Sequence, residues 1–214
     1  MLPAAIFNFM AVGGVPLETV SALLLLPLLA TLVAFARQVV GLKGFNIFTP
    51  LIIAFVFHEV GLEYGLTIFG LVIVSGLLAR LILKRWRLQY LPRMALIITV
   101  VTAAVLTMFF VAMFFDRFGF IEVSLLPVLV LVALAEQFAA VHIEHGAKVA
   151  LVLTLETALL ALLGFGVLSW SPLAALVLQY PIPYFVIIIV LNVALGRWTG
   201  LRLLEVWRFR TLLG

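Results

Sequence analysis

The chain has 214 residues, of which 66% are apolar and only 10% are charged, and its mean hydropathy is +1.36. A water-soluble domain carries roughly 25% charged residues, so this composition excludes an ordinary soluble protein and predicts a chain embedded in a lipid bilayer. The absence of cysteine excludes disulfides, thiolate nucleophiles and cysteine-ligated zinc, and the net charge of +4 is spread between apolar runs rather than gathered on one face, which argues against nucleic acid as a partner.

Long apolar runs follow one another along the chain, most of them near the ~20 residues that a helix needs to cross a bilayer core. They lie at residues 19–36, 44–57, 66–83, 94–115, 123–141 and 149–196. The last run is too long for one crossing, and the sequence SWSP at 169–172 divides it into two. The sequence therefore predicts an all-α polytopic membrane protein, with an apolar lead at 1–16, a bundle of seven transmembrane helices at 17–197 and a cytoplasmic interfacial helix at 198–214.

The first two runs carry irregular features. Pro27 predicts a kink in the first run. The second run, GFNIFTPLIIAFVF, gives only about 21 Å of helix against a core of about 30 Å. Two arrangements fit it: either the second and third runs both cross, or they form a re-entrant hairpin. The third run favours crossing, because Arg80 near its end can extend its side chain to the interface.

Lysine and arginine are enriched in short cytoplasmic loops of membrane proteins, so their distribution tests the seven-helix interpretation. Twelve of the thirteen basic residues fall in loops on one side of the predicted bundle, and only Arg117 falls on the other. This imbalance predicts that the amino end is outside and the carboxyl end is cytoplasmic.

The final segment, GRWTGLRLLEVWRFRTLLG, alternates basic residues with aromatic and aliphatic ones. Tryptophan favours the membrane interface and arginine favours anionic headgroups, so we expect a helix that lies along the cytoplasmic surface. The alternative is a helix that docks against the bundle or a partner. The residues expected to make the contact are Trp198, Arg202, Trp207 and Arg208.

Glu156 is the strongest intramembrane candidate for function, because a carboxylate inside a span costs about 2.5 to 3.5 kcal/mol on insertion scales. It lies near the middle of its run, beside Thr154. One interpretation is a proton or cation site, or a switch; the other is an interhelical hydrogen bond from an acid that can be protonated.

Glu136 lies nearer the cytoplasmic end of the fifth run, at a depth similar to that of Arg37, Arg93 and Arg197. We expect this cytoplasmic basic cluster to form ion pairs that hold helices together. The alternative is a binding site in which the arginines receive a phosphate or a carboxylate.

The sequence HIEHGAK offers His142, Glu144 and His145, but a metal would need further ligands and no zinc signature is present. No nucleophile elbow, phosphate loop or catalytic carboxylate pair is recognisable. We therefore expect no metal, no cofactor and no enzymatic activity.

Several motifs occur in an order that resembles a known family. They are FARQVVGLKGFNIFTP, YLPRMAL, TLET and NVALGRWTGLRLLEVWRFR. They are similar to the membrane module of a bacterial family of seven-helix proteins fused to an inactive transglutaminase-like domain. The resemblance implies the bacterial inner membrane, a domain outside the membrane ahead of the spans, and an association with ligases of the ATP-grasp kind. Because the chain begins with MLPAAIFNFMAVGG, we expect an excised module or a short relative.

The leading functional hypothesis is a signal-transducing or scaffolding module that couples an outer domain to a cytoplasmic partner. The alternative is a transporter of a small solute, a proton or a cation, with Glu156 at the midplane and broken helices at prolines. An intramembrane enzyme would need paired acids or histidines at one depth, for which Glu136 with His142 is a poor candidate.

The predicted topology can be tested with single cysteines, which are unique labels in a cysteine-free chain. We expect a cysteine placed between 116 and 122 to react with an impermeant thiol reagent added outside intact cells, and a cysteine in place of Gln89 to react only after lysis. The reverse pattern would show that the charge imbalance does not set the orientation.

Overall fold

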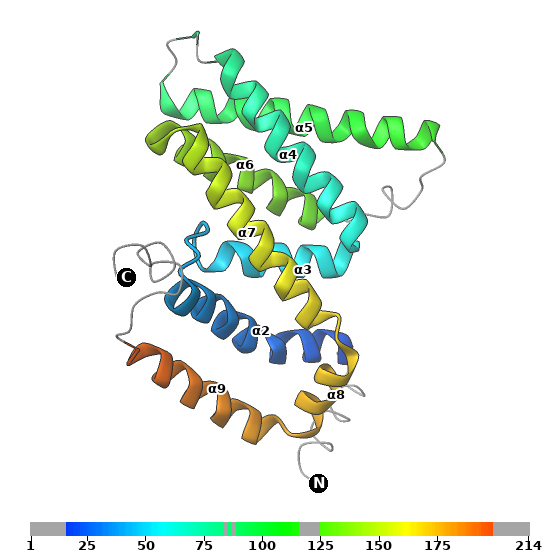
Figure 1. Ribbon diagram of the computed structural model, residues 1–214. Coiled ribbons are helices and arrows are strands. Elements are labelled where there is room, and N and C mark those ends of the chain that lie inside the picture. Colours follow the sequence, from blue (N-terminus) through cyan, green and yellow to red (C-terminus); the bar gives the residue numbers. More distant parts are fainter. Residues whose placement is uncertain (1–15, 84, 87–88, 116–124, 199–214) are drawn as a thin grey trace, which may run out of the picture. The chain divides into compact units, whose positions relative to one another are not determined.

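The computed structural model describes residues 16–83, 85–86, 89–115 and 125–198, which form helices and short turns without any strand (Figure 1). In chain order the helices are α2 (Leu17–Phe35), the π-helical turn η1 (Ala36–Val40), α3 (Phe48–Val60), α4 (Leu62–Leu83), α5 (Tyr90–Phe114), α6 (Leu125–His145), α7 (Ala147–Leu168), α8 (Ser171–Gln179) and α9 (Pro181–Gly196). Apart from Pro16 and Trp198, the predicted lead and the predicted interfacial helix lie outside the described residues.

The helices confirm an all-α membrane protein. Five of them are long and apolar enough to cross a bilayer, and the bent pair α8–α9 counts as a sixth span if it is taken as one segment. The seventh segment is α3, which is apolar but has only 13 residues, as expected from the short second run. α2 continues through Pro27 as one helix.

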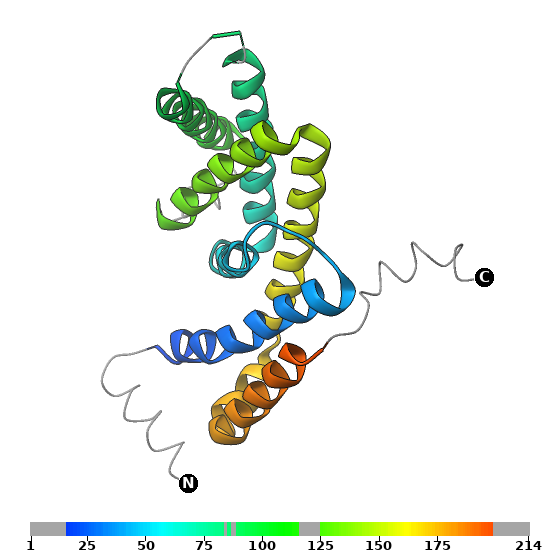
Figure 2. The same cartoon turned by 90° about the vertical axis from the view of Figure 1, so that its left-hand side faces the viewer.

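The chain divides into two compact units. The described residues up to Ala54 and those from Leu159 onward form the first unit. It contains α2, η1, α8, α9, the first part of α3 and the last part of α7. Phe55–Ala158 forms the second unit, whose main elements are α4, α5 and α6. In Figure 2 the pairing of α2 with α9 can be followed within the first unit.

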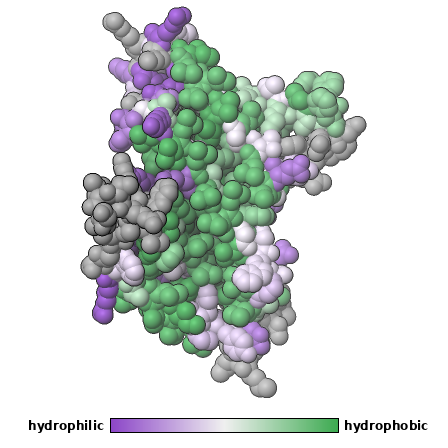
Figure 3. All heavy atoms as spheres, viewed as in Figure 1, coloured by the Kyte–Doolittle hydropathy of each residue, from purple (hydrophilic) through white to green (hydrophobic). Residues whose placement is uncertain are grey.

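Apolar side chains cover much of the outer surface of the helices (Figure 3). In α5 only 22% of the apolar stretch is buried within the protein, and Leu106, Phe110 and Phe114 are all more than half exposed. Contiguous apolar surface of this extent does not face water in a stable monomer, so these helix faces contact lipid.

Two of the connections between helices consist of a single glycine. Gly61 joins α3 to α4 and Gly146 joins α6 to α7, with φ of 90° and 87° respectively. A left-handed conformation reverses the chain abruptly and is strained for residues that carry a Cβ. The chain therefore turns sharply from one helix into the next at these positions.

The last predicted span contains a break, which the sequence analysis considered only in the transporter alternative, as helices broken at prolines. α8 and α9 are bent by 105° at Tyr180, which has φ −128° and ψ 59°. Pro181 follows directly; its ring disfavours a helical conformation for the preceding residue, and it is well suited to the first turn of a new helix. The predicted single span is therefore two helices of 9 and 16 residues.

A close contact at Gly164 holds α7 in the first unit and can be tested. A Cβ at this position would lie 2.8 Å from the Cβ of Ala54 and 3.3 Å from Cδ2 of Leu29, so Gly164→Ala overpacks the contact. We expect the variant to lose about 1–3 kcal/mol of the free energy of unfolding in detergent. Gly166→Ala in the same helix meets open space and serves as the control, with no loss expected. Equal stability of the two variants would contradict the contact.

Candidate functional site

Three side chains join α2 and η1 to α9 in the first unit. The Tyr184 hydroxyl donates to the carbonyl oxygen of Leu24 at 2.6 Å. The Asn192 amide donates to the hydroxyl of Thr31 at 2.7 Å, and the amide of Gln38 donates to the carbonyl oxygen of Leu195 at 2.6 Å. We call these three bonds the α2–α9 ladder.

The order of the ladder shows that the helices run in the same direction. Residues 24, 31 and 38 of the first segment pair in turn with 184, 192 and 195 of the last one. The start of α2 and the end of α9 therefore lie at opposite ends of the pair. α2 and η1 together span 24 residues, or about 36 Å, which is enough to cross a bilayer core.

The middle bond of the ladder uses the full donor capacity of one amide. Asn192 Nδ2 also donates to the carbonyl oxygen of Ile188 at 2.9 Å, while the Thr31 hydroxyl donates to the carbonyl oxygen of Pro27 at 2.8 Å. Thr31 is buried and α9 is otherwise apolar. A polar side chain in a lipid-facing helix is costly unless it is hydrogen-bonded, so these bonds favour one register of α2 against α9.

The last bond of the ladder lies at the point where the described chain ends. Besides Leu195, the Gln38 amide approaches the carbonyl oxygen of Trp198 at 3.4 Å. Arg37, the neighbouring residue, is half-buried and donates from Nη1 to the carbonyl oxygen of Phe45 at 2.8 Å. η1 therefore holds both the end of α9 and the loop that precedes α3.

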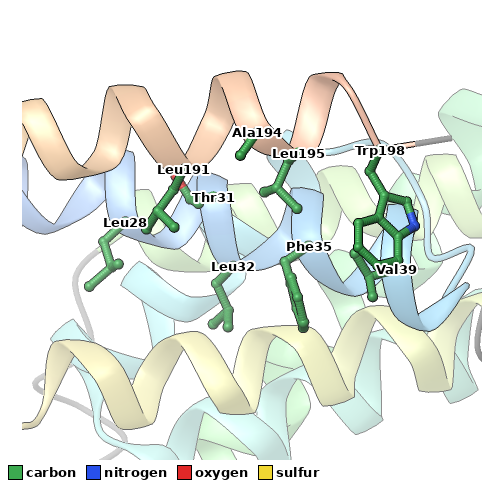
Figure 4. Close-up of a pocket in the computed structure, with 9 residues that line it drawn as sticks. All are labelled: Leu28, Thr31, Leu32, Phe35, Val39, Leu191, Ala194, Leu195 and Trp198. Carbon is green, nitrogen blue, oxygen red and sulfur yellow. The ribbon is translucent and has the colours of Figure 1, made fainter. Parts of the chain in front are cut away.

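A groove of about 400 Å³ lies between α2 and α9, with Trp198 at one end (Figure 4). Its lining residues are Leu28, Thr31, Leu32, Phe35, Val39, Leu191, Ala194, Leu195 and Trp198. Thr31 supplies the one hydroxyl of the lining, and this hydroxyl is already used by Asn192 and Pro27. A lining without an acid, a base or a free nucleophile suits a hydrocarbon chain rather than a reacting substrate.

Glu156 and Thr154 lie in α7, in the second unit. Thr154 is buried and its hydroxyl donates to the carbonyl oxygen of Ala150 within the same helix at 2.8 Å. Thr157, on the other side of Glu156, makes the same kind of bond to Leu153 at 2.7 Å. Glu156 itself is half-buried. Both threonine hydroxyls thus donate to carbonyl oxygens of their own helix.

The residues of the predicted basic cluster belong to different units. Arg37 and Arg197 lie in the first unit, whereas Glu136 and Arg93 lie in the second. Glu136 and Arg197 are exposed, and Arg93 is half-buried in the first turn of α5. In the second unit, the positive charge of Arg93 is close enough to act on that of Arg80 in α4.

The two histidines of HIEHGAK have different surroundings. His142 lies inside α6, is 9% exposed, and its ring is 5.8 Å from that of Phe138. His145 is exposed at the end of the helix, with Nδ1 3.8 Å from a carboxylate oxygen of Glu144. His142 therefore lies within a helix, because α6 extends past Val141, where the apolar run predicted from the sequence ends. Within the described ranges, no three His, Asp or Glu side chains are arranged to hold a metal ion.

The residues that join α2 to α9 were not identified from the sequence. Leu24, Thr31 and Gln38 recur at a spacing of seven, which places them on one face of a helix. Asn192 is a lone amide within the apolar stretch IIIVLNVALG. A polar residue in such a stretch predicts a helix contact, although its partner cannot be read from one sequence.

Comparison with protein families finds a match over residues 6–213 to a family described as seven transmembrane helices usually fused to an inactive transglutaminase. The match covers nearly the whole chain and confirms the resemblance found in the motifs. Searches of curated proteins and of solved structures gave no match.

The α2–α9 ladder generates a stability prediction. Asn192→Leu and Thr31→Val each remove the middle bond, and we expect each to lower the free energy of unfolding in mixed micelles by about 0.6–2 kcal/mol. The double variant should cost less than the sum of the two, because both remove the same bond. Thr99→Val is the control, since its hydroxyl bonds only to Ala95 in its own helix. Full additivity would show that the two residues are not coupled.

Proposed function

Because the chain belongs to the family of seven-transmembrane-helix modules usually fused to an inactive transglutaminase, we propose that it couples a domain outside the membrane to a protein on the cytoplasmic side. In this proposal the module is a signal-transducing or scaffolding element of the bacterial inner membrane. It is multi-pass, with its amino end outside and its carboxyl end in the cytoplasm.

The observation that carries the proposal is the α2–α9 ladder. α2 is the first described span and α9 is the last, so a fused domain ahead of α2 and the tail after α9 would attach to two helices that are hydrogen-bonded to each other. Because the two helices are parallel, these attachments leave from opposite ends of the pair. A shift of α2 relative to the membrane would therefore be passed to α9 by direct contact.

The distribution of charge supports a cytoplasmic partner. Residues 80–93 and the tail from Arg197 onward carry nine of the thirteen basic residues. Segments of this charge can attract an acidic protein surface as well as anionic lipid. An ATP-grasp ligase is the partner that the family resemblance suggests.

The structure of the groove supports a non-catalytic role. Neither the groove nor the ladder combines a nucleophile with a base, and the family description refers to a transglutaminase that is inactive. The module is therefore proposed to transmit a signal or to hold a partner protein, rather than to convert a substrate.

One observation favours the transporter alternative. The span made of α8 and α9 is broken at Tyr180, and interrupted spans form the substrate sites of many transporters. The ladder fixes α9 to α2, however, and that arrangement suits coupling better than independent movement of a half-helix.

The proposal predicts that contact with a cytoplasmic partner depends on the ladder. With a photo-crosslinking residue in place of Trp198 in the full-length protein in cells, we expect a cytoplasmic protein to be captured. The yield should fall when Gln38→Leu and Asn192→Leu remove two bonds of the ladder, because the end of α9 is no longer held.

Thr99→Val is again the matched control and should leave the yield unchanged at equal membrane abundance. Capture that is insensitive to the ladder, or no capture at all, would contradict coupling through α2 and α9. A flux of protons or cations into proteoliposomes would instead support the transporter, provided that Glu156→Gln abolishes this flux.

A further inference from the structure

α4, α5 and α6 meet at a close contact in the second unit. A Cβ at Gly76 of α4 would lie 3.5 Å from the Cβ of Ala135 in α6 and 3.8 Å from Cγ2 of Val101 in α5. Figure 1 shows that α5 runs back from the end of α4 and that α6 runs back along α5. The end of α4, the start of α5 and the end of α6 therefore lie on the same side of this contact.

Each of the three helices carries a nitrogen-bearing side chain between this contact and the helix end on that side. Arg80 lies four residues beyond Gly76, and His142 lies seven residues beyond Ala135, so each is on the same helix face as the contact residue. Arg93 lies eight residues before Val101, on the flank of the corresponding face. Hydrophilic side chains gather where α4 turns into α5 (Figure 3).

Two of these side chains present buried nitrogen atoms without a hydrogen-bond partner among the described residues. They are Nη1 of Arg80 and Nδ1 of His142, and the His142 side chain is more than nine-tenths buried. A buried donor left unsatisfied costs about 1–3 kcal/mol, more for a charged group. Native proteins retain such groups mainly where a ligand, an ion or water completes them.

Arg93 adds a second positive charge to this place. It is close enough to act electrostatically on Arg80, and an anion at this place would be attracted by both half-buried cations. The acids nearest to His142 along α6 are directed elsewhere. Glu144 is exposed and lies against His145, and Glu136 is exposed on another face of the helix.

We propose that the common end of α4, α5 and α6 is a binding site for a phosphate group, held by Arg80, Arg93 and His142. Guanidinium groups donate paired hydrogen bonds to phosphate oxygens, and a protonated imidazole nitrogen donates one more. The site lies at helix ends, Arg80 three residues before the end of α4 and Arg93 in the first turn of α5. The ends of membrane spans lie at the headgroup level, where phosphate is the most abundant anion.

The phosphate can come from a lipid headgroup or from a soluble phosphate-bearing molecule, and two probes distinguish these sources. The purified chain in an uncharged detergent is titrated either with inorganic phosphate at constant ionic strength or with short-chain phosphatidylglycerol. Binding is measured as a rise in the thermal unfolding midpoint. Stabilisation by the lipid alone identifies a headgroup site, and stabilisation by inorganic phosphate identifies a site open to soluble ligands; either supports the proposal.

Arg80→Gln should lower the affinity for the probe that binds by about tenfold or more, because it removes a charge-assisted hydrogen bond. Arg85→Gln is the matched control: this arginine is exposed in the turn after α4, and we expect no change in affinity. A second pair keeps the test valid if Arg80→Gln does not fold. His142→Asn retains a donor near the position of Nδ1 and should bind, whereas His142→Leu should not.

The proposal is overturned if neither probe stabilises the chain. It is also overturned if Arg85→Gln weakens binding as much as Arg80→Gln does, because the effect would then be one of general surface charge. Equal binding by His142→Asn and His142→Leu would remove His142 from the site and contradict the assignment.

Discussion

The structure depends on the need to satisfy polar groups where no water is available. Helices meet this need for the backbone. Between helices, Tyr184 and Asn192 of α9 donate to α2, and Gln38 of η1 donates to α9. Apolar packing alone would allow α9 to slide along α2, because lipid tails are as apolar as the leucines of the interface. Directional bonds with few alternative partners select one register.

The long spans could be predicted because their signal is local. The run at 66–83 corresponds to α4 (Leu62–Leu83), since a length of apolar sequence suffices to define a crossing helix. The break at Tyr180 was not part of the leading prediction, because the residues on both sides of it are apolar and hydropathy does not change there. Pro181 and Pro183 were the available signal, and a proline is compatible with a kink, a new helix or a full break.

Site residues were harder to predict, because their roles depend on neighbours that are distant in the chain. Asn192 lies 161 positions from Thr31, and nothing in the local sequence of either residue names the other. His142 lies just beyond the predicted apolar run, which ends at Val141, whereas the helix continues to His145. Arg80 was expected to extend towards the interface, but one of its terminal nitrogens is enclosed, which only the packing of α4 against its neighbours could reveal.

The single-residue joint at Gly61 has a consequence for biosynthesis. α3 has 13 residues, about 20 Å of helix, and is too short to remain stably in a bilayer by itself when it leaves the ribosome. Gly61 is the single residue between α3 and α4, and beside this turn a Cβ at Gly65 would lie 2.6 Å from Cδ1 of Phe57. Membrane insertion of the short helix is therefore tied to that of the long one, because no flexible segment separates the two.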